Sequence, residues 1–183
     1  RRSSDLNRNG NTFNGNAFVD ITFLKDFKFT FNVGTTVNEI RYYTTTNPYY
    51  GFGAEQNGTV TMYHYRTTTL NLQQILNYSH NFGKHNISVM LGHESYKYNY
   101  AELSASKKNM FSYWGNHELN GAVIDGSSAA SYSNDYNTEG YFFRALYDYD
   151  AKYYFSASYR RDASSRFHPD HWWGNFYSRS EEH

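Results

Sequence analysis

The stretch Gly140–Phe167, GYFFRALYDYDAKYYFSASYRRDASSRF, decides the fold of this chain. Between positions 141 and 149, one parity holds Tyr141, Phe143, Ala145, Tyr147 and Tyr149, and the other holds Phe142, Arg144, Leu146 and Asp148. Positions 153 to 160 repeat this design, with Tyr153, Phe155, Ala157 and Tyr159 against Tyr154, Ser156, Ser158 and Arg160. Because successive side chains of a strand point to opposite faces, each run is predicted to be a strand with one apolar and one mostly polar face. The short break at 150–152 predicts a hairpin.

The same alternation recurs upstream. Phe27, Phe29 and Phe31 alternate with Lys28 and Thr30, and they follow a tight turn at Leu24–Asp26. Together the patterned runs predict an all-β chain of about seven antiparallel, up-and-down strands. We expect three hairpins, at about 13–43, 68–100 and 140–163, with Val60–Phe82 as one long strand or two collinear pieces, and a partial last strand at about 171–178.

The connections between these runs alternate in length. In chain order they are expected at Leu24–Asp26 (short), Thr44–Gly58 (long), Phe82–Asn86 (short), Ala101–Thr138 (long), Asp150–Lys152 (short) and Ser164–Asp170 (intermediate). In an up-and-down array, this places the short turns at one end and the long loops at the other. Outer-membrane barrels have this asymmetry, with short periplasmic turns and longer extracellular loops.

Composition narrows the class of protein further. Only 39% of the 183 residues are hydrophobic, and 20% are aromatic, with 20 Tyr and 14 Phe. A soluble core normally depends on aliphatic residues, whereas tyrosine suits a surface that is apolar at one end and wet at the other. Zero formal net charge argues against a nucleic-acid binder, and the absence of cysteine excludes disulfides and thiolate metal sites. No apolar run approaches the length of a transmembrane helix, and the first residues contain no apolar signal segment.

Tyr96, Tyr98 and Tyr100 form a ladder at a predicted strand end, where the phase has moved by one residue. We interpret it as a membrane-interface girdle, with an exposed ladder on a soluble sheet as the alternative. Candidate ligand-binding residues are loop aromatics that could stack on sugars, with loop packing as the alternative; they are Tyr49, Tyr50, Tyr113 and Trp114. No catalytic, cofactor or metal constellation emerges, and His168 and His171 are interpreted as loop residues, so we do not expect an enzyme.

The opening stretch resembles the barrel of the SusC/RagA family of TonB-dependent outer-membrane transporters. The segment Tyr147-Asp148-Tyr149 and the motif RRDASSRF match the family pattern in register, and Trp173-Gly174 continues it. The motif residues are Arg160, Arg161, Asp162, Ser164, Ser165, Arg166 and Phe167. We place this motif at the outer rim and interpret it as a structural network that braces a loop, with anion binding as the alternative. Departures occur at Phe143, Ala163, Asn175 and Tyr177, and the similarity stops after Ser178.

The resemblance implies that residues 1–183 are an open fragment of a large, plugged outer-membrane barrel whose plug domain and TonB box lie outside this chain. The aromatic parity around Tyr141 would face lipid, and Arg144, Ser156, Ser158 and Arg160 would face a wet lumen. The complete protein would work with a SusD-like lipoprotein and TonB to import oligosaccharides or peptides. The alternative is a soluble, secreted β-sheet module that binds glycans. In that case the aromatic face should pack against a second sheet.

Overall fold

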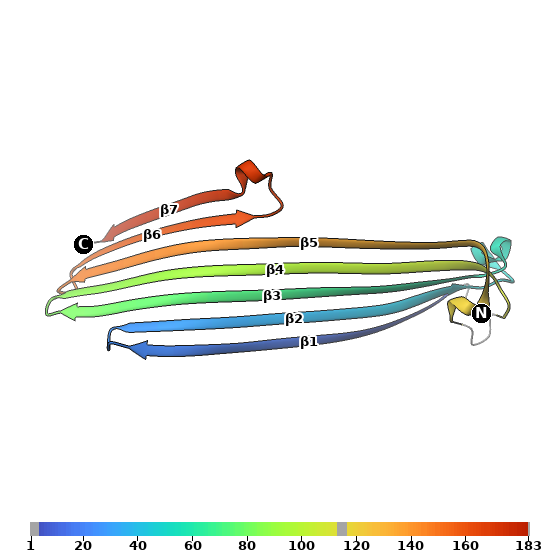
Figure 1. Cartoon of the computed structure of the whole chain (residues 1–183), viewed down its shortest axis with the longest axis horizontal. Helices are drawn as coiled ribbons and strands as arrows, with labels where there is room; N and C mark the ends of the chain where they lie inside the picture. Colours follow the sequence, from blue (N-terminus) through green and yellow to red (C-terminus); the bar gives the residue numbers. More distant parts are fainter. Residues whose placement is uncertain (1–3, 113–116, 183) are drawn as a thin grey trace. The chain divides into compact units, whose positions relative to one another are not determined.

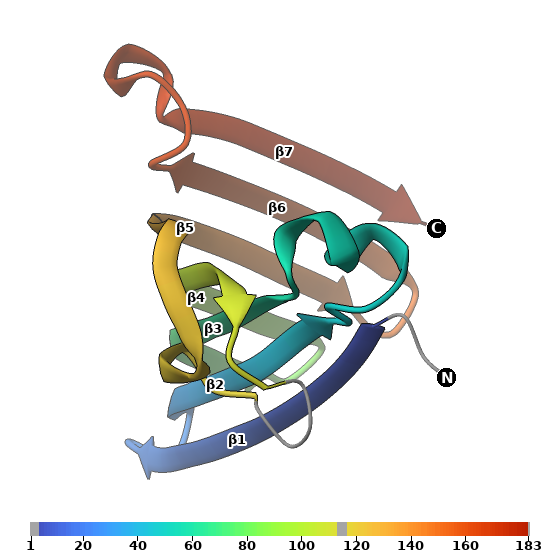
Figure 2. The same ribbon diagram turned by 90° about the vertical axis from the view of Figure 1, so that its right-hand side faces the viewer.

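The computed structural model describes residues 4–112 and 117–182. Within them, seven antiparallel strands form one sheet in chain order (Figure 1). The strands are β1 (Ser4–Phe23), β2 (Phe27–Thr46), β3 (Thr59–Phe82), β4 (His85–Met110), β5 (Ala122–Tyr149), β6 (Tyr153–Ser164) and β7 (Trp173–Glu182). Strands β1 and β7 are the two edges of the sheet and do not pair with each other (Figure 2). The predicted fold class, an open sheet of about seven up-and-down strands, is confirmed.

Three short 3-10 helices lie in the longer connections: η1 (Gly51–Gln56), η2 (Leu119–Gly121) and η3 (Pro169–His171). None of the helices in the described part of the chain is long and apolar enough to cross a membrane.

Several strands are longer than the sequence pattern predicted. The long loop expected over Ala101–Thr138 is wrong, because β4 continues to Met110 and β5 already begins at Ala122. Likewise β1 begins at Ser4 rather than Phe13, and β7 includes the tail beyond Ser178. Strand pairing uses the backbone, so a strand can continue where its side chains no longer alternate.

The predicted alternation of connection lengths is confirmed. Short turns occupy 24–26, 83–84 and 150–152, whereas the intervening connections occupy 47–58, 111–121 and 165–172. Hydrogen bonds connect the turn regions: the Asp150 amide donates to the Lys84 carbonyl of the neighbouring turn at 2.7 Å, and the Ser79 amide, near the end of β3, donates to the Asp26 carbonyl at 2.9 Å. The three short turns thus lie together at one end of their part of the sheet.

The chain divides into two compact units. The first takes in Arg1–Phe13, Thr36–Thr68 and Asn99–Asn134, and contains the connections 47–58 and 111–121. These connections pack on a small cluster of Val60, Met110 and Ala122, with Leu119 against it. The second unit takes in Asn14–Thr35, Thr69–Tyr98 and Asp135–His183, and contains the short turns and all of β6 and β7.

The second unit has no covered core. Among the described residues, the buried hydrophobic side chains are Ile40, Val60, Met110 and Ala122, and all four belong to the first unit. The described residues contain a single sheet, so the second sheet that the soluble alternative requires is not found there. The aromatic side chains of β5 and β6 are open to the surroundings instead of packing against another layer.

Candidate functional site

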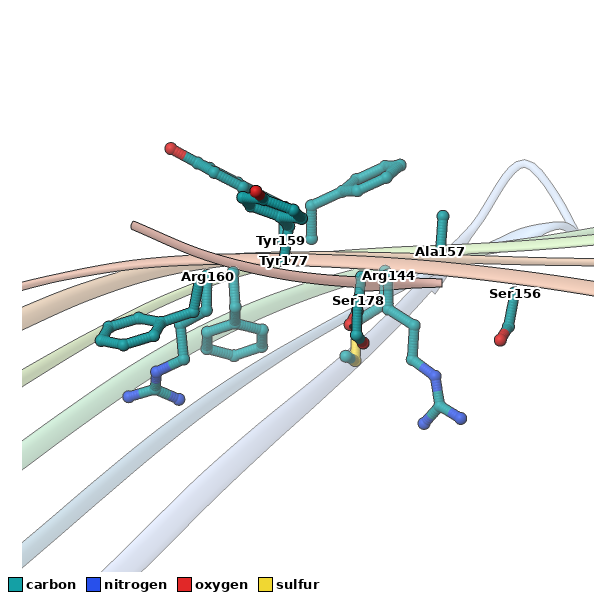
Figure 3. Close-up of a pocket in the computed structure, with 12 residues that line it drawn as sticks. Arg144, Ser156, Ala157, Tyr159, Arg160, Tyr177 and Ser178 are labelled. Atoms are coloured by element: carbon teal, nitrogen blue, oxygen red, sulfur yellow. Dashed lines mark hydrogen bonds between the residues drawn. The ribbon is translucent and has the colours of Figure 1, made fainter. Parts of the chain in front are cut away.

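Strands β5, β6 and β7 present two chemically different faces (Figure 3). Arg144, Arg160 and Ser156 project to one side of the sheet, whereas Ala157 and Tyr159 project to the other. The strand register explains this sorting. Phe142 lies opposite Arg160, and Phe143 lies opposite Tyr159, so each parity continues from strand to strand. We call the side with Arg144 and Arg160 the polar face and the side with Ala157 and Tyr159 the aromatic face.

The polar face carries a charged cluster formed by Glu94, Arg160 and Asp162. Arg160 Nε lies 2.8 Å from both carboxylate oxygens of Asp162, and Arg160 Nη2 lies 3.5 Å from Glu94 Oε1. The guanidinium also stands 5.8 Å from the centroid of the Phe142 ring. All three charged side chains are between a third and a half exposed, so each pair stabilises the fold by only about 0–1 kcal/mol. The cluster fixes the orientation of Arg160 more than it stabilises the sheet.

Phe142 lies over a glycine of the neighbouring strand. A Cβ atom added to Gly92 would come within 2.0 Å of Phe142 Cζ and 2.1 Å of its Cε2 atom. The aromatic ring therefore occupies the space that a side chain on β4 would need. This packing explains why position 92 holds a glycine.

The rest of the RRDASSRF motif folds the β6–β7 connection back on β5. Ser165 exchanges hydrogen bonds with Asn137, because the Ser165 amide donates to the Asn137 carbonyl at 3.0 Å and the Asn137 amide donates to Ser165 Oγ at 2.9 Å. Trp172 Nε1 donates to the Phe167 carbonyl at 2.7 Å, and the Arg166 guanidinium stacks 3.8 Å from the Tyr136 ring centroid. These contacts hold the β6–β7 connection in place through its own side chains and those of β5.

Arg161 differs from the other motif residues because it lies on the aromatic face. It is directly opposite Tyr141 in the β5–β6 register, and its guanidinium stacks 4.6 Å from the Trp173 ring centroid. Tyr141 and Trp173 are themselves neighbours, with ring centroids 5.9 Å apart. The two consecutive arginines of the motif thus lie on opposite faces of the sheet.

The aromatic face contains an aromatic row at each end, and the positions between the rows are aromatic or small: Phe143, Ala145 and Tyr147 on β5, and Phe155, Ala157 and Tyr159 on β6. Tyr149 and Tyr153 pair beside the short turn, and Tyr141 with its neighbour Trp173 marks the other row. Positions 141 and 149 are eight residues apart, which is about 27 Å along a strand. At the usual strand tilt of a barrel, this corresponds to a height of roughly 20 Å, close to the roughly 25 Å apolar band of outer-membrane barrels. The spacing fits two membrane-interface girdles.

A chain of hydrogen bonds on the aromatic face was not anticipated from the sequence. His93 Nδ1 lies 2.6 Å from Gln74 Oε1, and His93 Nε2 lies 2.9 Å from Glu139 Oε1. The Tyr141 hydroxyl donates to the same Glu139 oxygen at 3.0 Å. The sequence does place His93 on the same side of its strand as the aliphatic residues Ile87, Val89 and Leu91. A histidine in such surroundings needs polar partners, and this could have indicated the contact.

The interpretation of the tyrosine ladder as a girdle is wrong for its face. Tyr96 follows two positions after Glu94, which pairs with Arg160 on the polar face. Tyr98 stacks on Tyr136 with ring centroids 4.9 Å apart, and Tyr136 also receives Arg166. The phase change seen in the sequence therefore moves these tyrosines to the polar face, away from the aromatic rows.

Charged residues also lie on the aromatic face at the C-terminal end of β7. Arg179 lies opposite Ala157, and Glu181 lies opposite Phe155, so both charged residues belong to the aromatic face by register. This is the stretch where the similarity to the SusC/RagA pattern stops. Its charges are unlike the small and aromatic residues that surround them.

The predicted loop aromatics lie in the first unit. Tyr49 is 72% exposed and Phe52 is fully exposed, whereas Tyr50 is half-buried. The two loops pack through Val60 and its aliphatic neighbours, so loop packing does not use Tyr49 or Phe52. The other two candidates, Tyr113 and Trp114, lie outside the described residues.

No metal centre is found among the described residues, since no three His, Cys, Asp or Glu side chains gather closely enough to hold an ion. The nearest arrangement in the β6–β7 connection is a pair, in which His168 Nδ1 lies 3.3 Å from Asp170 Oδ2. Both side chains are exposed, so this pair behaves as an ordinary surface contact.

Comparisons with known proteins agree with this geometry. No protein-family model matches the chain. Over 167 residues, 87% of its length, the chain is 29% identical to the TonB-dependent receptor P3 of Formosa agariphila. Its fold is similar to that of the RagAB peptide transporter, with a TM-score of 0.89 over 98% of the chain at 23% identity. The open-open state of the RagAB peptide importer gives a TM-score of 0.87 over the same share of the chain.

The chain spans only part of these relatives. It covers 16% of the length of the Formosa receptor and 20% of the matching RagAB chain. Because the match extends over nearly the whole of this chain, it concerns every strand of the sheet. The chain is therefore similar in sequence to a segment of the Formosa TonB-dependent receptor, and its fold is that of a segment of the RagAB chain.

Proposed function

We propose that this chain forms part of the wall of a transporter that imports oligosaccharides or peptides through the outer membrane. The observation that supports this function best is the division of one uncovered sheet into two faces. The aromatic face has two aromatic rows at the spacing of a lipid bilayer, and it meets lipid. The polar face, with Arg144, Ser156 and Arg160, lines the wet interior through which the substrate moves.

The aromatic and polar faces have different energetic requirements in a membrane. Phe155 and Tyr147 are more than a third exposed without any protein layer over them, which is costly in water but favourable in lipid. The paired backbones of β2 to β6 leave no open edge between them, as a bilayer requires. The edges at β1 and β7 are then completed by further strands of the same barrel.

Exposed loop aromatics and the relatives support two candidate substrate classes. RagAB is a peptide transporter, and a similar wall supports peptide import. Tyr49 and Phe52 are exposed aromatic residues of the connection that contains η1, and such rings are suited to stacking on sugars. We propose oligosaccharides as the first candidate and peptides as the second. A SusD-like lipoprotein would cover the loops, and TonB would supply the energy for import.

We expect the double variant Tyr49→Ala with Phe52→Ala in the full-length receptor to weaken oligosaccharide binding by about 5- to 150-fold, because two stacked rings at about 0.5–1.5 kcal/mol each contribute about 1–3 kcal/mol together. Binding of labelled oligosaccharide is measured on cells treated with an uncoupler of the proton gradient, and uptake of labelled oligosaccharide and peptide mixtures is measured with and without the uncoupler. Glu55→Gln is the matched control, since Glu55 is an exposed residue of the same η1 turn.

Each result of this experiment tests a separate part of the proposal. Uptake that persists without the proton gradient would contradict import driven through TonB. Unchanged oligosaccharide binding by the double variant would remove the sugar-stacking role of Tyr49 and Phe52. Uptake of peptides but not oligosaccharides would select the second candidate substrate.

A further inference from the structure

We propose that Arg161 and Trp173 form a binding site for the phosphate group of an outer-leaflet glycolipid. The proposal rests on the proposed function in one respect, namely that the aromatic face meets lipid. It adds a specific ligand contact to a surface that otherwise needs only apolar solvation. The site is defined by Arg161, Trp173, Tyr141 and Asn175.

The site is built by three neighbouring strands. Tyr141 on β5 and Asn175 on β7 both lie directly opposite Arg161 on β6. The Trp173 ring supports the guanidinium at 4.6 Å. The Asn175 side-chain oxygen accepts a hydrogen bond from the Tyr159 hydroxyl at 2.9 Å, which orients the amide so that its NH2 group can donate to a phosphate oxygen. A fixed guanidinium beside an amide donor is suited to a phosphate.

The charge of Arg161 is not neutralised by the protein. Among the described residues, no carboxylate lies within ion-pair distance of its guanidinium, which is exposed. On the same face, the Glu139 carboxylate binds His93 of β4 and Tyr141 of β5 instead. Arg160, by contrast, is held by Asp162 and Glu94 on the polar face. The adjacent arginines therefore differ in whether a carboxylate pairs with the guanidinium, and an anionic ligand needs the guanidinium without such a pair.

The height of the site selects the ligand. Arg161 lies in the aromatic row that is remote from the short turn at 150–152, and short turns mark the periplasmic end of an outer-membrane barrel. Tyrosine and tryptophan at such a row sit at the level of lipid headgroups. A guanidinium stacked on tryptophan at this depth meets the headgroup phosphate of the outer leaflet, and basic groups on membrane proteins commonly recognise anionic headgroups.

The test uses the full-length receptor in phosphatidylcholine nanodiscs, with diphosphoryl lipid A as the probe. Bound lipid A is measured by native mass spectrometry for the wild type, Arg161→Gln and Arg160→Gln. We expect Arg161→Gln to lower lipid A affinity by about tenfold, because it removes a charge-assisted contact with phosphate. Arg160→Gln, which changes the preceding residue on the opposite face, should leave the affinity within about twofold of the wild type. Dephosphorylated lipid A should bind the wild type as weakly as lipid A binds Arg161→Gln.

The proposal is overturned if Arg161→Gln binds lipid A as tightly as the wild type, or if the dephosphorylated probe binds equally well. Arg161→Lys guards against a folding defect, since it keeps the charge and should retain most of the affinity. A fluorophore at Ala157→Cys, with brominated acyl chains as quenchers, tests the proposed function separately. Quenching with no effect of Arg161→Gln would reject the phosphate site alone, whereas absence of quenching would reject lipid contact by the aromatic face itself.

Discussion

Ala145→Arg should destabilise the full-length receptor in lipid vesicles by about 2–4 kcal/mol, the cost of an arginine near the middle of a bilayer on the lipid side of a barrel. Ala145 lies opposite Ala157 on the aromatic face, midway between the Tyr141 and Tyr149 rows. A guanidinium there has no carboxylate partner on β6 and cannot reach water without crossing half of the band.

The matched control is Leu146→Arg, one residue further along the same strand. Leu146 faces the other way, lies opposite Ser156 on the polar face and is 38% exposed. Replacing this larger apolar residue by arginine should cost no more than about 1 kcal/mol, because the new charge remains hydrated. Urea unfolding of the receptor in vesicles measures both variants. Equal costs at positions 145 and 146 would mean that the two faces see the same medium.

Gly92→Ala should destabilise the receptor by about 1–3 kcal/mol, although it changes a single hydrogen to a methyl group. The added Cβ would lie 2.0 Å from Phe142 Cζ and 2.7 Å from Phe142 Cδ2, so the whole ring has to move. Overpacking of this kind normally forces side chains off their rotamers or shifts the backbone. The displaced ring would also leave its position beside the Arg160 guanidinium.

Removing the ring should remove the penalty. In the Phe142→Ala background, Gly92→Ala is expected to cost less than about 0.5 kcal/mol, so the double-mutant cycle gives a coupling of at least about 0.5 kcal/mol. Gly174→Ala is the control, because a Cβ there would meet Phe176 Cε2 at 3.3 Å, a tight contact that a ring shift of a few tenths of an ångström relieves. Additive effects of the Gly92 and Phe142 changes would show that ring and glycine do not share space.

The alternation of residues 141–149 and 153–160 was enough to predict the β5–β6 hairpin and its two faces. In this stretch one parity is aromatic or small and the other holds most of the polar residues, so the alternation is clear although Phe142, Leu146 and Tyr154 lie on the polar face. The lengths of the connections likewise predicted which turns are neighbours. These features depend on local sequence, and the structure retains them.

The same reasoning failed where both faces of a strand are polar. The chain from 101 to 138 is rich in Ser, Asn and Gly, yet much of it belongs to β4 and β5. Nothing in those side chains alternates, because neither face needs to be apolar, and the strands are defined by backbone pairing. Sequence patterns of burial cannot reveal a strand of this kind.

The candidate site was predictable as a motif but not as a geometry. The sequence shows Arg160 and Arg161 as equivalent members of RRDASSRF, and only the register shows that one pairs with Asp162 and the other stacks on Trp173. The His93–Glu139 contact joins positions far apart in the chain. Cross-strand partners depend on register between distant segments, which a single sequence does not determine.

We expect one face of this sheet to meet lipid and the other to meet water. Single cysteines at positions 142 to 147 of a cysteine-free full-length receptor, labelled with a fluorophore in vesicles of brominated lipid, test it residue by residue. We expect strong quenching at 143, 145 and 147, which lie on the aromatic face. We expect reaction with a membrane-impermeant thiol reagent at 142, 144 and 146, which lie on the polar face. Quenching and reactivity that do not alternate with a period of two residues, or that alternate in the opposite sense, would contradict it.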